Sequence, residues 1–129
     1  GGSLGAQPLN VLVPEVARHL HKRLGESAVH IRHQSGQGHA DSVRADYGVL
    51  LGEGVEVSAF IEDMAAAYAW ADVVICRSGA LTVAELAIMG RPALLIPLPH
   101  AIDDHQTANA RALSDRGAAL LLRQAELTA

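Results

Sequence analysis

The segment from Asp72 to Glu85 carries the residues best suited to hold a charged ligand. Its pattern predicts a buried strand over Val73–Cys76, a small-residue turn at Ser78-Gly79-Ala80 and a helix opening near Thr82. Such a turn lets a ligand approach the backbone, and the free N–H groups at a helix start favour an anion such as phosphate. In an open α/β sheet, ligands bind outside the carboxyl ends of strands, where this turn falls.

The same segment also has a purely structural interpretation. Thr82, followed three residues later by Glu85, has the pattern of a capping box, which closes a helix start without any ligand. Strand–turn–helix units occur in α/β proteins of many functions. Taken alone, the segment leaves a ligand site and a plain helix cap open.

A second polar group follows the predicted strand at Ala93–Ile96. Gln106 and Asn109 are three residues apart and share one face of a predicted helix, where their amides could bind the hydroxyls of a sugar or simply meet solvent. His100, Asp103, Asp104 and His105 invite a metal interpretation. Their spacing matches no standard zinc site, and acidic residues at a helix start are explained by capping and by the helix dipole. We therefore expect no metal.

The chain opens on the glycine-rich stretch Gly1-Gly-Ser-Leu-Gly-Ala6, which leads into the first predicted helix. A loop of this kind meets a phosphate when a strand precedes it and fixes the turn. No strand precedes it here, so a flexible leader remains the alternative. We expect the chain to be a piece of a longer protein.

Composition limits the remaining possibilities. The 129 residues are 50% hydrophobic but include only one Trp, two Tyr and one Phe, so the core must be aliphatic, which suits buried parallel strands. The net charge is −4 and no basic run appears, so nucleic acid is not an expected partner. The single cysteine, Cys76, lies in an apolar strand pattern and is expected to be an inert core residue. No apolar run is long enough to span a membrane, so we expect a soluble domain.

Helical and strand patterns alternate along the whole chain. This alternation predicts an α/β fold with a Rossmann-like parallel sheet and helices on both of its faces. Asp63 is the expected cap of one helix and Gly90 the terminator of another. Helices are predicted over Gln7–Leu24, Ala40–Leu51, Asp63–Ala71, Thr82–Met89 and His105–Asp115, and strands over Ala28–Arg32, Val55–Phe60, Val73–Cys76, Ala93–Ile96 and Ala118–Leu122.

Five segments are considered together: Gly1-Gly-Ser-Leu-Gly-Ala6, His33-Gln-Ser-Gly36, Phe60 to Tyr68, Ala71 to Glu85 and Asp104 to Ala110. They resemble the MurG family of bacterial N-acetylglucosaminyltransferases, over essentially the whole chain and in the order seen there. The resemblance implies the donor-binding, C-terminal half of the two-domain GT-B glycosyltransferase fold. The family transfers N-acetylglucosamine from its UDP donor to undecaprenyl-pyrophosphoryl-N-acetylmuramoyl-pentapeptide, the lipid I to lipid II step of peptidoglycan synthesis.

The resemblance also implies a role for individual residues. Ser3 would meet the diphosphate, Ile61 would offer backbone groups to the uracil edge beside Met64, and Glu85 would accept hydrogen bonds from the ribose. The amides of the predicted helix would hold the sugar hydroxyls. The implied donor-binding residues are Ser3, Ile61, Ala80, Leu81, Thr82, Val83, Ala84, Glu85, Gln106 and Asn109. No cofactor, metal or catalytic residue is implied within this chain, and no covalent sugar–enzyme intermediate is expected.

The resemblance further implies that the acceptor-binding half and its membrane-contact surface lie outside this chain. The lipid-linked acceptor would then be bound by that other half, at the cytoplasmic face of the bacterial inner membrane. This chain alone is expected to have no transferase activity and to bind donor weakly or not at all. Two alternatives stay open: another UDP-sugar enzyme of the GT-B fold, such as a UDP-N-acetylglucosamine epimerase, and a non-catalytic α/β module.

Overall fold

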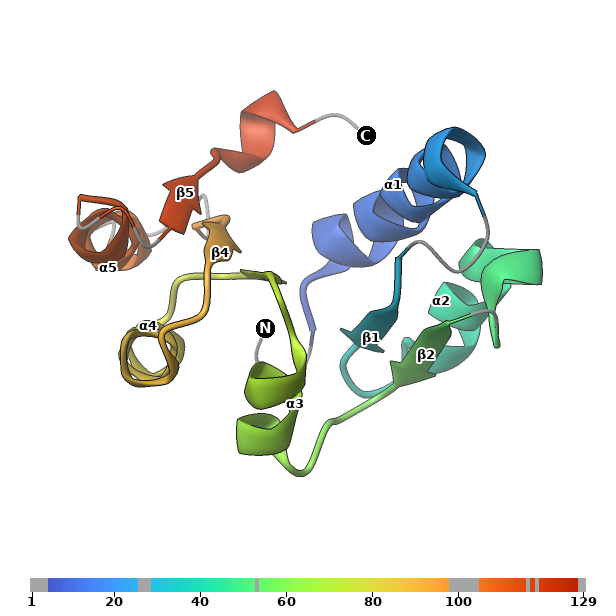
Figure 1. The fold of residues 1–129 in the computed structure, drawn as a ribbon, viewed down its shortest axis with the longest axis horizontal. Helices are drawn as coiled ribbons and strands as arrows, with labels where there is room; N and C mark the ends of the chain where they lie inside the picture. Colours follow the sequence, from blue (N-terminus) through green and yellow to red (C-terminus); the bar gives the residue numbers. More distant parts are fainter. Residues whose placement is uncertain are drawn as a thin grey trace. The chain divides into compact units, whose positions relative to one another are not determined.

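The computed structural model describes residues 5–25, 29–52, 54–97, 105–115, 117 and 119–127. They fall into two compact units, the first reaching Glu62 and the second running from Asp63 to Leu127. Helices and strands alternate through both units (Figure 1). The predicted parallel α/β organisation is confirmed, and the described strands are divided between two parallel sheets, one in each unit.

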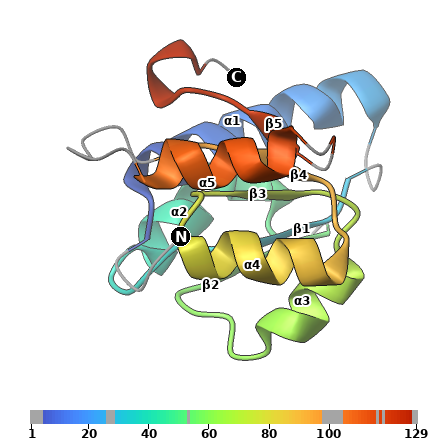
Figure 2. The same ribbon diagram turned by 90° about the vertical axis from the view of Figure 1, so that its left-hand side faces the viewer.

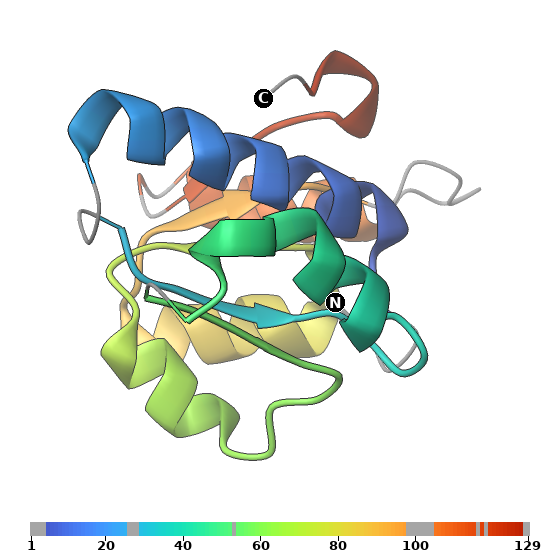
Figure 3. The ribbon, with the colours of Figure 1, turned by 90° about the vertical axis from the view of Figure 1, so that its right-hand side faces the viewer.

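The first unit packs two helices on a two-stranded sheet. Strands β1 and β2 run parallel, with Ile31 opposite Val55 and Gln34 opposite Ser58, and their pairing continues from the Ser35 N–H to the Ser58 carbonyl at 2.9 Å. Helices α1 and α2 lie side by side (Figure 3). The bounds are α1 Gln7–Leu24, β1 Ile31–Gln34, α2 Ala40–Tyr47, a 3₁₀ turn Gly48–Leu50, and β2 Val55–Ser58.

An aliphatic core joins these elements, as the composition predicts. Its buried members come from α1, α2, the 3₁₀ turn and β2, and removing such side chains from water is the main term that stabilises the unit. Helix α1 keeps its predicted bounds and continues through Pro14, which is buried. The core residues are Ala17, Val43, Tyr47, Leu50, Val55 and Val57.

Three elements of this unit differ from their predicted bounds. Strand β2 ends at Ser58 rather than at Phe60. Strand β1 spans Ile31–Gln34 rather than Ala28–Arg32, so His33 and Gln34, which follow the predicted strand, belong to it. The ring of His33 is buried but hydrogen-bonded on both nitrogens, which lets a polar residue occupy an inward strand position. Helix α2 stops at Tyr47, and the remainder of the predicted helix is the 3₁₀ turn.

The second unit is built on the three-stranded parallel sheet β3–β4–β5. Cys76, Leu95 and Leu121 are register partners at its carboxyl edge. Helices α4 and α5 lie side by side (Figure 2). The bounds are α3 Met64–Trp70, β3 Val74–Cys76, α4 Ala80–Met89, β4 Ala93–Leu95, α5 His105–Ser114, β5 Ala119–Leu121 and a 3₁₀ turn Gln124–Glu126.

The helix ends of this unit follow from local chemistry. The Asp63 side chain accepts a hydrogen bond from the Ala66 N–H at 3.0 Å, so the predicted cap of α3 is confirmed. Gly90 adopts a left-handed conformation with φ 67° and returns its N–H to the Leu86 carbonyl, which ends α4 as predicted. Cys76 packs in the core beside Tyr68 and Leu86, and burial raises the pKa of its thiol to about 11. A thiol of this kind stays protonated at neutral pH, as expected of an inert core residue.

Candidate functional site

The turn between β3 and α4 keeps its predicted place at the carboxyl edge of the sheet, but the helix begins earlier than predicted. Helix α4 starts at Ala80, and Gly79 is its N-cap, with no side chain closing the helix. The first helical hydrogen bond runs from the Val83 N–H to the Gly79 carbonyl at 3.0 Å. Thr82 is therefore inside the first turn, and the predicted Thr82–Glu85 capping box is wrong.

This correction bears on what the turn can do. The first N–H groups of a helix have no partner within the helix, so those of Ala80, Leu81 and Thr82 point out of its N-terminal end. The positive end of the helix dipole lies at the same place and favours an anion. No side chain caps this end of α4 by a hydrogen bond. The side-chain cap that was the alternative to a ligand site is therefore not formed.

Glu85 lies one turn into α4 and is half-buried. It faces Tyr68 of α3, a core residue whose pKa is raised by burial first and then by a hydrogen bond and the negative charge of Glu85. The hydrogen bond with the buried Tyr68 hydroxyl therefore limits the positions that the Glu85 carboxylate can adopt. Met64, at the start of α3, packs against the same core and is half-buried.

The start of α5 is tied to the β3–α4 turn by two hydrogen bonds. The hydroxyl of Ser78 donates to the Gln106 carbonyl at 2.6 Å, and the Asn109 side-chain amide donates to the Ser78 carbonyl at 3.1 Å. Ser78 is completely buried, whereas Gln106 and Asn109 are half-buried. The structure thus brings the predicted sugar-binding residues together with the turn, through a serine that the sequence did not single out.

Arg77 reinforces the same edge of the sheet. Its guanidinium donates to the carbonyls of Ile96 and Pro97, at 3.4 and 3.3 Å, and so connects the end of β3 with the end of β4. Partial burial lowers its pKa. An arginine keeps its charge under any ordinary shift, so this edge carries a fixed positive charge close to the candidate anion site.

In the first unit, Ile61 follows the carboxyl end of β2. Its N–H donates to the side-chain carbonyl of Gln34, the last residue of β1, at 2.9 Å. A ligand edge would reach this N–H only by displacing Gln34. Ser3 lies outside the described residues. So do His100, Asp103 and Asp104, which were considered as metal ligands, and the side chain of His105.

A buried polar network that the sequence did not predict lies beside Gly5. The Asn10 side chain accepts from His33 Nε2 at 2.8 Å and donates to the Ser35 carbonyl at 2.9 Å, while the Tyr47 hydroxyl lies 2.7 Å from His33 Nδ1. Because the Asn10 oxygen can only accept, His33 carries its proton on Nε2 and the Tyr47 hydroxyl donates. The sequence offers one indication of this network: Asn10 is a polar residue that lies one helical turn before the apolar residues Val13 and Pro14.

This network holds the chain entering α1 against the end of β1. Gly5 has φ +78°, and a Cβ built on it would lie 2.1 Å from the Ser35 carbonyl oxygen. Only glycine fits such a close backbone approach without movement of the neighbouring chain. From Gly5 onward, packing against Ser35 therefore fixes the conformation of the segment before α1, in contrast to the flexible leader of the alternative interpretation.

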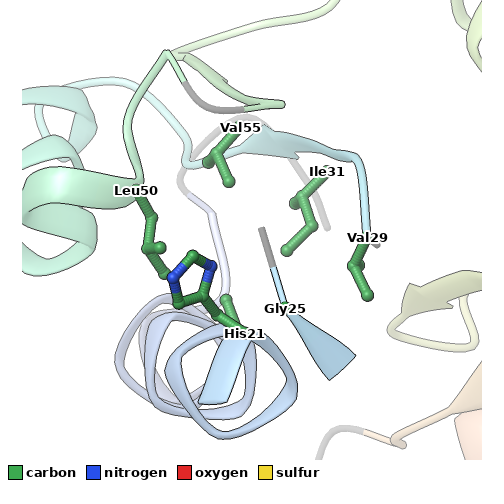
Figure 4. A pocket seen from close by; sticks show the side chains of 7 residues that line it. His21, Gly25, Val29, Ile31, Leu50 and Val55 are labelled. Atoms are coloured by element: carbon green, nitrogen blue, oxygen red, sulfur yellow. The ribbon is translucent and has the colours of Figure 1, made fainter. Parts of the chain in front are cut away.

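A pocket in the first unit is lined by none of the candidate donor-binding residues. Its lining comes from the C-terminal half of α1 and from residues at the amino ends of β1 and β2 (Figure 4). The lining is mostly aliphatic, and ligands of open α/β sheets bind at the opposite, carboxyl edge. The residues are Ala17, His21, Gly25, Val29, Ile31, Leu50 and Val55.

Neither a metal site nor a membrane span appears in the described part of the chain. Among those residues, no three His, Cys, Asp or Glu side chains are close enough to hold a metal ion. None of the described helices is long and apolar enough to cross a membrane.

Parallel sheets with polar turns at their carboxyl edges define the Rossmann-like class of α/β folds. Within that class, residues 1–129 match the C-terminal domain of glycosyltransferase family 28. The chain belongs to this family.

Known proteins agree with this membership. The chain is 55% identical, over its whole length, to 35% of the UDP-N-acetylglucosamine–N-acetylmuramyl-(pentapeptide) pyrophosphoryl-undecaprenol N-acetylglucosamine transferase of Tolumonas auensis. Over 96% of the chain it is 56% identical to 34% of the same-named protein of Pseudomonas paraeruginosa. The crystal structure of MurG from Acinetobacter baumannii superimposes with a TM-score of 0.86 at 45% identity, covering 99% of this chain and 36% of that one. The chain therefore spans about a third of the length of these relatives, and its fold is that of part of a GT-B glycosyltransferase.

Proposed function

We propose that this chain is the donor-binding part of a glycosyltransferase that moves N-acetylglucosamine from UDP-N-acetylglucosamine to a lipid-linked muramoyl-pentapeptide in peptidoglycan synthesis. The observation that carries the proposal is the uncapped start of α4, which is fixed to the start of α5 through Ser78. Backbone N–H groups and half-buried amides in one place are what a nucleotide sugar requires. The names of the similar proteins support this donor and acceptor.

The proposed donor site assigns one task to each group of residues. The N-terminal turn of α4, from Ala80 to Ala84, faces the diphosphate, and Glu85 accepts hydrogen bonds from the ribose hydroxyls. Ile61 presents its backbone to the uracil, and Ser3 meets the diphosphate from the glycine-rich loop. Gln106 and Asn109 serve the N-acetylglucosamine end.

The chemistry proposed for this site is positioning and charge neutralisation. Negative charge develops on the leaving diphosphate, and fixed N–H groups and a helix dipole stabilise it without reorganising during the reaction. The proposal needs no metal or cofactor in this chain. The acceptor, the proton-accepting group and the attachment to the cytoplasmic face of the membrane are assigned to the part of the protein outside this chain.

The test is an assay of the natural full-length protein that carries this chain. Incubation with UDP-N-acetylglucosamine and a soluble analogue of the lipid-linked acceptor should release UDP and yield the disaccharide product. A UDP-sugar epimerase, the second candidate on this fold, would instead convert the donor without any acceptor. Epimerised donor, or no release of UDP, would refute the proposal.

A further inference from the structure

Ser78 is the point where the two halves of the proposed donor site meet. It lies between β3 and α4, yet its hydroxyl and its backbone carbonyl are both bonded to α5, which begins far along the chain. Its exposed fraction is 0%, so neither bond has water as a ready substitute. A buried polar group that loses its partner carries a desolvation penalty, which makes such contacts strongly directional.

Asn109 makes one of these contacts with the donor half of its amide. Its Nδ2 lies 3.1 Å from the Ser78 carbonyl oxygen, so one N–H of this amide holds the turn before α4. An amide has a second N–H and an acceptor oxygen, so this bond is compatible with a contact between the same side chain and a sugar hydroxyl. The geometry therefore gives Asn109 an effect on the helix start that faces the diphosphate.

We propose that Ser78 and Asn109 are positioning residues that fix the N-terminal turn of α4 against α5 and thereby set the diphosphate-binding geometry. The inference deepens the proposed function and rests on it. It gives Asn109 a task besides its proposed contact with the sugar, exerted through the Ser78 carbonyl. It also adds Ser78, which touches no ligand in this account.

Ser78 and Asn109 predict different ligand dependences. Because Ser78 acts through the turn alone, Ser78→Ala weakens the binding of UDP and of UDP-N-acetylglucosamine by the same factor, about three- to tenfold for the loss of one hydrogen bond. Asn109→Ala weakens UDP binding by a similar factor and UDP-N-acetylglucosamine binding by more, because the sugar contact is lost as well. Binding of uridine, which has no diphosphate, stays within about twofold of the wild-type value for both variants.

The two substitutions should also fail to add. Residues that act through one contact show a large interaction term in a double-mutant cycle, so the double variant should bind UDP no more weakly than the worse single variant. Ser114→Ala is the matched control, because Ser114 lies on α5 and its hydroxyl donates to the Arg111 carbonyl within the same helix. It should leave all three affinities unchanged.

The experiment is a calorimetric titration of the natural full-length protein with UDP and UDP-N-acetylglucosamine, with ligand-observed NMR for uridine. Thermal unfolding of each variant checks its fold, and if Ser78→Ala does not fold, Asn109→Ala and Asn109→Leu decide. UDP affinity that is unchanged in both Ser78→Ala and Asn109→Ala would overturn the inference, and a loss of UDP-N-acetylglucosamine binding by Asn109→Ala alone would then leave Asn109 with the sugar contact only. Equal loss for uridine would overturn it in favour of a general structural effect. A wild-type protein that binds no UDP would refute the proposed function, and the inference with it.

Discussion

At the residue scale, the buried His33 shows how one side chain connects structure with pH. Its two ring nitrogens are bonded to Asn10 and Tyr47, in an arrangement that requires the neutral ring. Burial lowers the pKa of His33 from 6.5 to about 4. The unfolded chain therefore binds a proton at mildly acidic pH where the folded chain does not.

The consequence for stability has a definite sign. His33 contributes stability that is fully present above pH 6.5 and is lost as the pH falls from about 6.5 towards about 4, because only the unfolded state becomes protonated there. The full loss is on the order of 3 kcal/mol. Urea unfolding at pH 7.5 and at pH 5 should show about 2 kcal/mol of this loss in the wild-type chain, because pH 5 lies part of the way between the two pKa values.

Two variants isolate the contribution of this ring. His33→Gln should make the free energy of unfolding less dependent on pH across this window, whatever its stability at neutral pH. His19→Gln, on an exposed position of α1, should keep the wild-type dependence. Equal pH dependence in the wild type and His33→Gln would contradict the assignment.

At the element scale, substitution of Gly5, just before α1, is predicted to destabilise the chain far more than substitution of Gly38, just before α2. Gly5 and Gly38 both have positive φ, but a Cβ on Gly5 would meet the Ser35 carbonyl, whereas one on Gly38 meets nothing within 4 Å. Gly38→Ala should cost on the order of 1 kcal/mol for the backbone conformation alone. Gly5→Ala should cost several-fold more, because the chain must also move.

Urea unfolding of both variants measures this difference. The same Gly5→Ala variant should bind UDP more weakly in the full-length protein, since the displaced segment leads directly to Ser3 in the proposed diphosphate loop. Equal destabilisation by the two substitutions would show that the close approach to Ser35 has no energetic weight.

The elements also show which features the sequence could predict. The apolar runs of β3 and β4, the Asp63 cap and the Gly90 terminator depend on neighbouring residues alone, so local patterns were sufficient. The start of α4 was missed because Thr82 and Glu85 have the spacing of a capping box, whereas the observed N-cap is Gly79. A glycine cap leaves no side-chain pattern to read.

Features that depend on distant partners were beyond local patterns. By sequence, His33 lies just beyond the predicted strand Ala28–Arg32, and its ring partners Asn10 and Tyr47 come from distant positions in the chain. Ser78 reads as part of a small-residue turn until Asn109 and Gln106 are seen on its carbonyl and hydroxyl. In both cases the sequence indicated the correct neighbourhood, while the tertiary contacts determined the role of the individual residue.

At the scale of the whole molecule, the chain corresponds to about a third of its relatives, 35% of the Tolumonas auensis protein and 36% of the Acinetobacter baumannii structure. A donor site without the acceptor side cannot position two substrates, and positioning is the main source of rate in such a transfer. We therefore expect the 129-residue chain alone to show no transfer to the lipid-linked acceptor analogue. Product formation by the isolated chain, above the level of a heat-denatured sample, would contradict this expectation.

The central claim is that the β3–α4 segment binds a nucleotide through Glu85, and a calorimetric titration with UDP tests it most directly. A hydrogen bond to a charged group is worth about 1.5–3 kcal/mol, so Glu85→Ala in the full-length protein should weaken UDP binding at least about tenfold. Glu56→Ala, at an exposed position of β2, should bind like the wild type. Removing a ribose hydroxyl, as in 2′-deoxy-UDP, should weaken binding to the wild type more than binding to Glu85→Ala. Equal UDP affinity of the wild type and Glu85→Ala would contradict the account.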